Sequence, residues 1–494
     1  MPIKEAEWFR QRSYAHFDFP LAKDKATKLV SNPQNIKQHA FMPLIADYVK
    51  SVSKKRAPSG KRIYEKKRRP IAYASHSDSY IYSFYSLKLN TLLEKQYKTD
   101  PLCSQAVLAY RKFPDGHSNT NIHFANDVFN DIKERDNCVV IALDVEGFFD
   151  NLNHLILKEA WESLLKVSRL PNDHFAVYKA ATRSSAIFRP LLGEILRQPE
   201  VRRRRGNKNL KICKITTFRK HVAPKLEPFQ NIIARIKKEK KAPDLTKGIP
   251  QGLPISATLA NLYMLETDRF LAQYVNELNG VYRRYSDDIL FIIPKKHAKQ
   301  IEDTAVKEIE NICLKIQQEK TQRILFQQIN GKKRAFSLDD EYKSDNKLTR
   351  VEYLGFSFDG EQVLIKNSTV TRFMMKASKA IRQAQRSALA ESKRLNRKPK
   401  LKKRKLFARL TTLGYGSAYG TIVYEKEKEN VIPSIFPRLG FFEYAKRAQT
   451  ITNSFQLTKQ IAQIENQVYR LINEAEKSLQ QMWCEKRGLL IEGK

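Results

Sequence analysis

Residues 282–293 read Y-R-R-Y-S-D-D-I-L-F-I-I and place two adjacent carboxylates, Asp287 and Asp288, directly before an apolar run. The run Ile289–Ile293 is apolar and β-branched enough to be a buried strand. An ionised carboxylate at the start of such a strand costs several kcal/mol unless a partner or a metal ion compensates its charge. The segment alone leaves two interpretations open: a solvated Ser-Asp-Asp hairpin turn, or a cation site.

A third carboxylate, Asp144, follows another short β-branched run, Val139–Leu143. If the two runs are neighbouring strands and the Asp pair lies on a hairpin turn, the three carboxylates converge at one sheet edge. Their mutual repulsion is unfavourable, and divalent cations would turn it into binding because they prefer carboxylate oxygen. Two such ions, roughly 3.5–4 Å apart, activate an attacking hydroxyl and stabilise a leaving pyrophosphate. We therefore expect a two-metal site for nucleotidyl transfer.

The net charge limits the partners that the chain can have. Its 494 residues contain 90 Lys and Arg against 52 Asp and Glu, a formal net charge of +38. Such a charge opposes a compact state unless a polyanion neutralises it, and nucleic acid is the usual polyanion. A membrane surface is the alternative partner. However, no stretch is apolar enough to span a bilayer, and the N-terminal M-P-I-K-E-A-E-W is no signal peptide.

Length and composition predict a globular protein of two or three subdomains. The chain is too long for one ordinary core, and its 41% of hydrophobic residues suffice for a sizeable one. The cysteines are scattered without a C-x-x-C pair, which predicts small buried thiols in a reducing intracellular compartment rather than disulfides or zinc ligands. They are Cys103, Cys138, Cys213, Cys313 and Cys484.

Periodicity and turn residues predict the order of elements along the chain. Residues 1–60, rich in aromatic and basic residues, form an N-terminal extension packed on the next part of the chain. Residues 202–241 are strongly basic and form an insertion or mobile arm, with a solvated disordered loop as the alternative. Helices are expected at 75–97, 152–167, 298–318, 369–405 and 455–483 and after the Gly/Pro turn that opens 248–264; short strands are expected at 322–329 and 351–366.

Four segments occur in a telling order: A-L-D-V-E-G-F-F-D-N-L-N-H (142–154), K-G-I-P-Q-G-L-P-I-S-A-T-L-A-N-L-Y-M (247–264), R-Y-S-D-D-I-L-F (284–291) and E-Y-L-G-F-S-F (352–358). They resemble the palm signatures of reverse transcriptases, Tyr-x-Asp-Asp included. Y-R-K-F-P-D-G-H-S-N-T (110–120) is similar to the fingers segment of bacterial members, and Q-Q-E-K-T-Q (317–322) is similar to their lysine motif. The resemblance covers roughly residues 70–365, and the ordered set is far more specific than any one member.

This resemblance implies an α+β right-hand polymerase: fingers, a palm with an antiparallel sheet flanked by helices, and a helical thumb. The implied parts are an N-terminal extension (1–70), fingers (71–143), a first palm part (144–200), a basic insertion between fingers and palm (201–247), a second palm part with the primer grip (248–366), and a basic helical thumb with the C-terminal region (367–494).

The resemblance also assigns roles to the matching residues. Asp144, Asp287 and Asp288 would hold two Mg²⁺ ions, Mn²⁺ being possible, with the backbone carbonyl of Val145 as a further oxygen ligand. Lys320 would protonate the leaving pyrophosphate as a general acid, and a plain surface lysine is the alternative.

A dNTP pocket is implied by five further positions. Arg111 and Lys112 would hold the triphosphate, and Gln251 and Gly252 would line the pocket, the glycine because only a bare backbone fits there. Phe149 would exclude a ribose 2′-OH by its bulk, and a core aromatic beside Phe148 is the alternative. In the second palm part, the turn Leu354-Gly355 would grip the primer terminus.

The N-terminal S-Y-A-H-F-D-F-P-L, together with S-H-S-D-S-Y-I-Y-S-F-Y (75–85), is most similar to the "unknown group" of bacterial reverse transcriptases, which defend their hosts against phage. Class 9 and class 3 are the candidate classes. Retron enzymes match less well, because S-N-T-N-I-H-F-A (118–125) only partly matches their Asn-Ala-x-x-His element and their thumb Val-Thr-Gly is absent. A group II intron protein would share the palm, but no C-terminal zinc-type endonuclease motif is present.

Enzymes of that group commonly bind and copy a structured non-coding RNA. The basic stretches 202–241 and 393–409 are candidates to hold such an RNA in the bacterial cytoplasm, through Arg202, Arg203, Arg204, Arg205, Lys402, Lys403 and Arg404. The primer is either an RNA hydroxyl or a protein hydroxyl such as Tyr415, Tyr419 or Tyr424. The last helix is either a homo-oligomer interface or packed within the chain.

Three other functions remain open at this point. The same site would serve an enzyme that adds nucleotides with little or no template and makes repetitive DNA. A vestigial palm would leave an RNA scaffold, which the complete Asp144, Asp287 and Asp288 set argues against. An RNA-directed RNA polymerase is disfavoured by Phe149 and by the Tyr-Ser-Asp-Asp sequence.

Overall fold

The structure is a computed structural model that describes residues 8–56, 62–111, 120–197, 211–411, 421–423, 434–436 and 440–485. The chain forms two compact units whose segments alternate along the sequence. Unit 1 comprises residues 1–118, 139–323 and 339–343, and unit 2 comprises residues 119–138, 324–338 and 344–494.

Three antiparallel strands carry the predicted carboxylates. They are β3 (Cys138–Asp144), β6 (Val281–Tyr285) and β7 (Asp288–Ile293), and β7 pairs with both of the others. Every residue of β7 after Asp288 is buried, as are Val139–Ile141 of β3. Because both faces of these strands are covered, they read as continuous apolar runs rather than as an alternating pattern. The predicted pairing of the two runs and the hairpin turn are confirmed.

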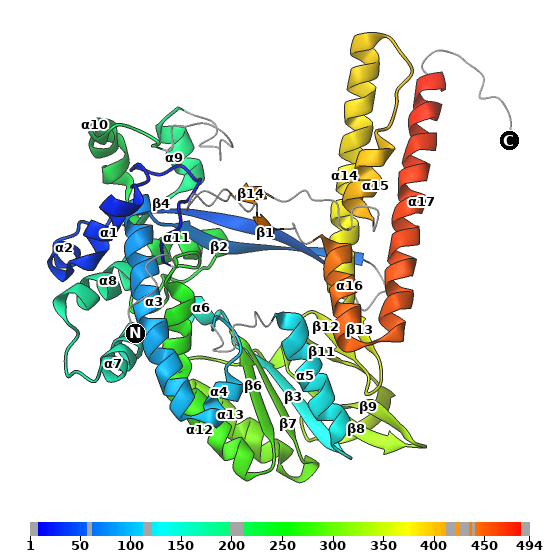
Figure 1. Cartoon of the computed structure of the whole chain (residues 1–494), viewed down its shortest axis with the longest axis horizontal. Helices are drawn as coiled ribbons and strands as arrows, with labels where there is room; N and C mark the ends of the chain where they lie inside the picture. The colour runs from blue at the N-terminus through cyan, green and yellow to red at the C-terminus, as the bar shows by residue number, and fades with distance from the viewer. Residues whose placement is uncertain are drawn as a thin grey trace. The chain divides into compact units, whose positions relative to one another are not determined.

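Long helices cover this part of unit 1. Figure 1 shows α3 (His76–Thr99) beside α12 (Ser256–Glu277), and the hydroxyl of Thr258 bonds Ser86 at 2.7 Å. Both helices were predicted. Helix α13 (Ala298–Asn311) ends seven residues earlier than the predicted 298–318, since residues 315–317 instead run extended beside residues 144–146. The other helical segments of unit 1 are α1 (Lys23–Ser31), α2 (Pro33–Lys37), α4 (Pro101–Ala106), α6 (Phe148–Asn151), α7 (His154–Leu165), α8 (Asn172–Thr182), α9 (Arg189–Ile195), α10 (Ile215–Thr217), η1 (Phe218–Val222), η2 (Ala223–Lys225), α11 (Phe229–Lys237), η3 (Lys295–His297) and η4 (Gln318–Lys320).

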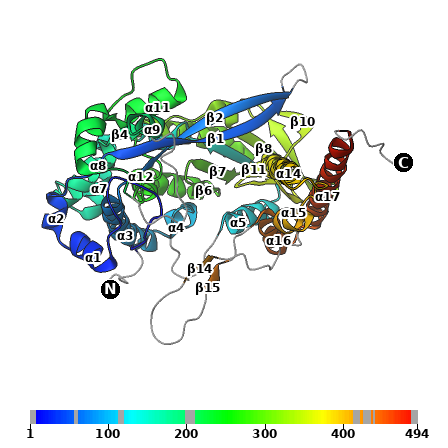
Figure 2. The same cartoon turned by 90° about the horizontal axis from the view of Figure 1, so that it is seen from above.

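A second sheet of unit 1 was not predicted. Its order is β2-β1-β4-β5, with β1 (Leu44–Arg56) and β2 (Arg62–Tyr73) as long antiparallel neighbours, which Figure 2 shows side by side. β4 (Ser185–Phe188) pairs in parallel with the start of β1, and β5 (Glu227–Pro228) lies at the edge. β1 begins with the buried apolar residues Leu44–Ala46, and the rest of its sequence mixes polar and apolar residues without a regular alternation, so the strand was not recognised.

The N-terminal segment packs on the start of α3, as predicted. Both carboxylate oxygens of Asp18 accept hydrogen bonds from the helix N-terminus, from His76 N and Ser77 N, each at 2.9 Å. The hydroxyl of Tyr14 donates to Ala74 O at 2.8 Å. A carboxylate at a helix N-terminus is stabilised by the unpaired amides and by the helix dipole, which fixes this extension on α3.

The predicted mobile arm at 202–241 is wrong for its second half. Residues 198–210 lie outside the described residues, but Phe229–Lys237 form the helix α11. Its spacing F-x-x-I-I-x-x-I buries Phe229, Ile232, Ile233 and Ile236, while its two basic residues, Arg235 and Lys237, lie in the last turn and are not buried. The apolar face outweighs the charge, so this helix belongs to the core of unit 1.

Unit 2 combines short antiparallel strands with long helices. Its strands are β8 (Gln322–Ile329), which begins at the boundary with unit 1, β9 (Lys332–Leu338), β10 (Ser344–Leu348), β11 (Val351–Tyr353), β12 (Phe356–Phe358), β13 (Val363–Ile365), β14 (Thr421–Val423) and β15 (Ser434–Phe436). Its helices are α5 (Asn121–Glu134), α14 (Asn367–Leu395), α15 (Lys403–Leu410), α16 (Phe441–Thr452) and α17 (Phe455–Glu485). The predicted strand regions 322–329 and 351–366 are confirmed, whereas β9 and β10 were not predicted.

The last helix packs within the chain. Figure 1 shows α17 alongside α14, and Val468, Ile472 and Leu479 of α17 are buried in one cluster with residues of α14 and α15. Helix α14 ends at Leu395, earlier than the predicted 405, because Asn396 takes the left-handed conformation (φ 44°) that terminates helices. No helix among the residues that the structure describes is long and apolar enough to cross a membrane.

Candidate active site

The Asp pair lies at a tight hairpin between β6 and β7. Tyr285 pairs with Asp288, so Ser286 and Asp287 form the two-residue turn, and Ser286 has a left-handed backbone (φ 62°). On its other side Asp288 pairs directly with Asp144 of β3. Side chains that are directly opposite in an antiparallel pair have Cβ atoms about 4.5–5.5 Å apart. The hairpin turn is therefore present, and the register places Asp144 and Asp288 opposite each other beside it.

A lysine compensates part of this negative charge. The ammonium of Lys320, on the 3₁₀ turn η4, forms an ion pair with the carboxylate of Asp144. Backbone hydrogen bonds place the segment before Lys320 beside the end of β3. Gln317 N donates to Asp144 O at 2.8 Å, and residues 145 and 316 form an isolated bridge. The Lys320 side chain is 47% exposed, so it can leave Asp144 without a large loss of packing.

The donor types suit a hard divalent cation. Asp144 and Asp288 face each other, Asp287 is the adjacent turn residue, and Val145 adds a backbone carbonyl, all of them oxygen ligands. Among the described residues, however, no group of three or more His, Cys, Asp or Glu side chains is gathered as a metal would require. The Asp144 carboxylate instead forms an ion pair with Lys320. The residues therefore fit the ion in chemistry, and binding requires Asp144 to exchange partners.

The predicted pocket residues Phe149, Gln251 and Gly252 belong to one backbone arrangement. Ile249 N donates to Phe149 O at 2.8 Å, and Ala72 N donates to Gln251 O at 2.8 Å. Gly252 has φ 109°, and a Cβ there would lie 2.6 Å from Ala72 O, so only glycine fits. Phe149 is half-buried and meets the buried Phe148 edge to face with ring centroids 5.5 Å apart. Its roles in the gate and in the core both stay predictions.

Arg111 forms its contacts inside unit 1. Its guanidinium is bidentate to Glu94, at 3.0 and 2.9 Å, and also donates to the carbonyl of Val107 at 3.1 Å. The ring centroid of Tyr97 lies 4.1 Å from it, and only 2% of the side chain is exposed. The donors of Arg111 are thus used inside unit 1, and its contact with a triphosphate stays a prediction. Lys112 lies outside the described residues.

A buried ion pair beneath the hairpin was missed. Arg284 donates to Asp268 of α12 through Nε at 2.7 Å and Nη2 at 2.5 Å, and both side chains are at most 1% exposed. Its Nη1 donates to Ser286 O at 3.1 Å, which ties the pair to the turn. Burial alone would lower the pKa of Arg284, but Asp268 outweighs it and raises that pKa. The sequence feature that could have indicated this ion pair is Asp268, a carboxylate among the apolar residues of α12.

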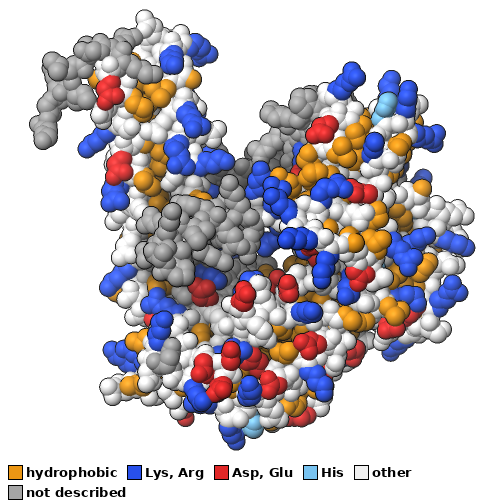
Figure 3. Space-filling model, turned by 180° about the vertical axis from the view of Figure 1, so that it is seen from behind, with side chains coloured by type: hydrophobic (Ala, Val, Ile, Leu, Met, Phe, Trp, Pro, Cys, Tyr) orange, Lys and Arg blue, Asp and Glu red, His pale blue; other side chains and the backbone are white. Residues whose placement is uncertain are grey.

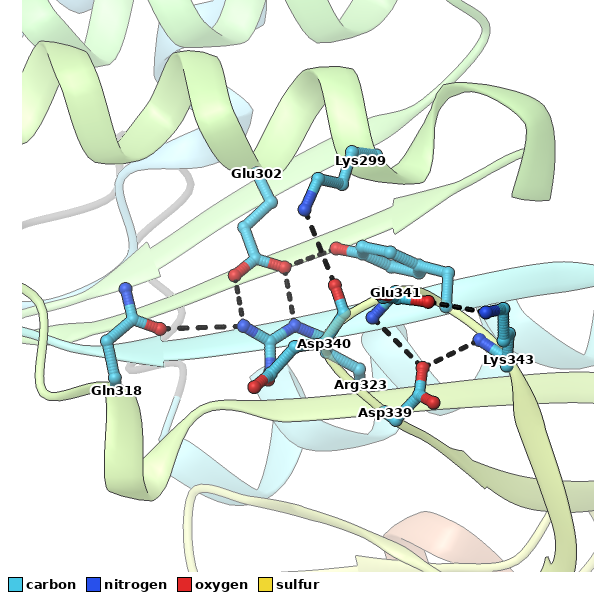
Figure 4. Close-up of polar contacts among 9 residues, drawn as sticks. Lys299, Glu302, Gln318, Arg323, Asp339, Asp340, Glu341 and Lys343 are labelled. Atoms are coloured by element: carbon cyan, nitrogen blue, oxygen red, sulfur yellow. Dashed lines mark hydrogen bonds and ion pairs between the residues drawn. The ribbon is translucent and has the colours of Figure 1, made fainter.

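A second cluster supports the turn that carries Lys320 (Figure 4). Arg323, three residues after Lys320, is bidentate to the buried Glu302 at 2.7 and 2.5 Å and lies 3.5 Å from Gln318 Oε1. These hydrogen bonds to Glu302 raise the pKa of Arg323. Arg323 also donates to Asp340 at 2.6 Å. One end of the Lys320 turn is thus held by β3 and the other by α13.

In unit 2, Leu354 and Gly355 form the predicted turn. Tyr353 pairs with Phe356, and both turn residues have positive φ, 45° and 93°, as type I′ hairpins require. Asn121 Nδ2 holds the turn by donating to Leu354 O at 2.9 Å. The same amide lies 3.0 Å from the hydroxyl of Tyr444, a contact that the sequence did not reveal. Contact with a primer stays a prediction.

The RNA-binding candidates are only partly described. Arg202–Arg205 and the tyrosines 415, 419 and 424 lie outside the described residues. Lys402 pairs with Glu391 at 2.9 Å and Lys403 with Glu476 at 2.6 Å, whereas Arg404 is exposed. Figure 3 shows many Lys and Arg side chains on one face, with Asp and Glu side chains between them. Such surface pairs are weak enough to exchange for phosphate, so these residues stay predictions.

Residues 209–358 match the family model described as "Reverse transcriptase (RNA-dependent DNA polymerase)". This stretch of the chain is therefore similar to the domain of RNA-directed DNA polymerases, and the predicted right-hand polymerase fold class is confirmed. The matched span includes Asp287, Asp288 and Lys320; Asp144 precedes it.

Solved structures of telomerases are similar to the chain. They are apo telomerase from Candida tropicalis truncated from the C-terminal domain (12% identity, 70% of this chain and 60% of that one, TM-score 0.39), apo telomerase from Candida tropicalis (13%, 67% and 51%, 0.35), and telomerase from Candida albicans in complex with the TWJ fragment of telomeric RNA (10%, 92% and 64%, 0.36). The chain spans less than two thirds of each. No curated protein sequence matches it.

Proposed function

We propose that the chain is an RNA-directed DNA polymerase that joins dNTPs to a primer at the β3–β7 edge. The observation that carries the proposal is the register of that ladder, which sets Asp144 opposite Asp288 beside Lys320. A carboxylate cluster of this kind destabilises a sheet unless cations bind it, which gives the arrangement a reason to exist. The reverse transcriptase match over residues 209–358 supports this chemistry.

The residues of the chain divide the work of transfer. When bound at Asp144, Asp287, Asp288 and the Val145 carbonyl, two Mg²⁺ or Mn²⁺ ions would supply the Lewis-acid chemistry. Lys320, once released from Asp144, holds a proton on Nζ that it can give to the leaving pyrophosphate.

Two other residues would contribute through their shape and position and not through proton transfer. The Phe149 ring excludes a ribose 2′-OH by its bulk, which selects dNTPs. Arg284 keeps the Ser286-Asp287 turn in place through its bond to Ser286 O.

A more specific proposal concerns the RNA partner, the product and the cellular role. The +38 charge favours a lasting RNA partner, so we propose that a structured non-coding RNA serves as template and scaffold and that cDNA is the product. The N-terminal motifs support a role in bacterial phage defence in the cytoplasm, with a homo-oligomer as a possible assembly state. Arg404 and the Arg202–Arg205 run are proposed RNA contacts.

The test is to purify the protein from cells with its nucleic acid and to sequence both RNA and DNA. The matched variants are Asp287→Ala with Asp288→Ala, and the exposed control Asp303→Ala with Glu310→Ala, which alters net charge equally. One defined RNA, with complementary DNA from wild type and control only, is the expected result. Homopolymeric DNA would favour synthesis with little template, and DNA that persists in the Asp287/Asp288 variant would refute the site.

A further inference from the structure

Unit 1 contains a cavity of about 940 Å³ that the candidate polymerase site does not use. Residues from α7, α8, β4, β5 and α11 line it, together with the segment at Leu245 and Thr246. No predicted catalytic or dNTP-binding residue is among them. Its volume lies near the upper end of the ~300–1,000 Å³ range of sites that bind small organic groups.

One wall of the cavity is aromatic and unusually exposed. Phe175 stacks on Tyr178 with ring centroids 6.0 Å apart and an interplanar angle of 29°, yet 43% of Phe175 is exposed. The hydroxyl of Tyr178 donates to His154 O at 2.7 Å, and its ring meets Trp161 edge to face, so it is fixed. Other apolar side chains of the lining are exposed as well: Leu155 by 61% and Leu245 by 50%.

The same cavity carries positive charge. Lys179 follows Phe175 by four residues on α8, so the two share one face of the helix, and Arg183 directly follows the last residue of the helix; both cations are exposed. Neither forms an ion pair with any residue of the described ranges. The one lining carboxylate, Glu227, is already paired with Arg235 at 2.6 Å. Burial lowers the pKa of the neighbouring His154, and the charge of Arg183 acts in the same direction.

From this juxtaposition we propose that the cavity binds one nucleotide of a single-stranded RNA. The base stacks on the free face of Phe175 between Leu155 and Leu245, and the phosphate lies at Lys179 and Arg183. Proteins bind single strands by this combination of aromatic platforms and cations. A purely apolar occupant would leave both cations unmatched, and a simple anion would not use the aromatic wall. The inference rests on the proposed function, since it names a place where the RNA partner is held.

The experiment uses the full chain and a short fluorescent single-stranded RNA of mixed sequence that contains 4-thiouridine. Photo-crosslinking and then peptide mapping locate the contact, and fluorescence anisotropy measures affinity. Phe175→Ala is compared with Phe270→Ala, a matched control because Phe270 is 44% exposed and stacks on Tyr274 with centroids 5.8 Å apart. Lys179→Ala with Arg183→Ala is compared with Lys307→Ala, an exposed lysine of α13.

A crosslink on residues 172–183 is expected in wild type. Phe175→Ala should remove it and weaken binding about tenfold, the usual effect of losing one stacked base, while Phe270→Ala leaves both unchanged. Removal of both cations should lower the slope of log affinity against log salt by about 0.7 per cation. Equal thermal unfolding of variant and control shows that the fold is intact.

Three results would overturn the proposal. One is a crosslink map that omits residues 172–183. Another is loss of the crosslink when a free mononucleotide is added at a concentration too low to displace an RNA strand. That result would make the cavity a metabolite site. The third is a mass change of the assembly in Phe175→Ala without loss of RNA, which would make the face a protein interface. If the Asp287→Ala, Asp288→Ala variant still synthesised DNA, the proposed function would be refuted. The crosslink would still test whether RNA binds in the cavity.

Discussion

Replacing Asp268 by Asn should reveal what the buried ion pair does. The exchange keeps the shape of the side chain but leaves the Arg284 guanidinium buried without its counter-charge. Asp268 also accepts from the Tyr282 hydroxyl at 2.7 Å, and Arg284 lies 3.3 Å from Asn261 Oδ1. The amide can preserve some of these bonds but not the charge. We therefore expect a large loss of stability in unit 1.

The magnitude comes from the burial of both groups. Breaking a buried ion pair by removing one partner costs about 3–5 kcal/mol. In a unit of about 300 residues, that corresponds to a drop of roughly 5–8 °C in melting temperature. The exposed pair Glu266–Arg269 on the same helix has its groups 2.7 Å apart with 69% and 27% of the side chains accessible. Glu266→Gln should therefore change the melting temperature by no more than about 1 °C.

A third variant separates stability from positioning. Asp268→Leu with Arg284→Met removes both charges, an exchange that is often neutral or stabilising. It also removes the bond from Arg284 to Ser286 O, so the left-handed turn loses a support. Thermal unfolding should recover while primer extension stays impaired. A melting temperature for Asp268→Asn within about 1 °C of wild type, or full synthesis by the double variant, would refute this reasoning.

Three further variants test the pocket, the counter-ion and the core. Phe149→Ala should let rNTPs compete with dNTPs in primer extension, and unchanged sugar discrimination would remove Phe149 from the gate. Lys320→Met should slow synthesis by about 10²–10⁴-fold and yet tighten Mn²⁺ binding measured by electron paramagnetic resonance, because no ammonium then competes for Asp144; weaker Mn²⁺ binding would contradict this. Burial lowers the pKa of His16 to about 4, below the ~6.5 of an unfolded chain, so the unfolded state takes up the proton first as pH falls from about 6.5 to about 4 and stability drops by about 3 kcal/mol. His16→Gln should flatten the melting temperature over that window, and parallel curves would exclude His16 as the cause.

The parts of the fold that the sequence predicted are those where local pattern and burial agree. β3 and β7 are buried on both faces and read as unbroken apolar runs, and α3 and α17 have apolar residues at helical spacing. The pairing of β3 with β7 was a hypothesis based on charge. Carboxylates beside buried apolar runs are unfavourable unless they lie close enough together to share bound cations. Leu354 and Gly355 were placed in a turn by the family motif, and their backbone conformation agrees.

The missed parts depend on partners far away in the chain. β1 and β2 pair over twelve positions, although neither strand has a continuous or alternating apolar sequence, so the ladder and not a side-chain pattern defines them. α11 was obscured by its own lysines. Arg111 fits a family motif, but the sequence could not show that Glu94, one helix earlier, would use its guanidinium.

Two cations near the hairpin have different roles: Arg284 pairs with the buried Asp268, and Lys320 pairs with Asp144. Arg284 lies below the turn and is fully neutralised by Asp268, so it supports the Ser286 backbone without adding net charge to the site. Lys320 lies at the edge, half-exposed, and meets Asp144 directly. The buried cation therefore cannot exchange, whereas the exposed one can. This difference in burial separates a fixed framework from a replaceable counter-ion, and under the proposed function we expect it to leave Asp144 free to exchange Lys320 for a cation.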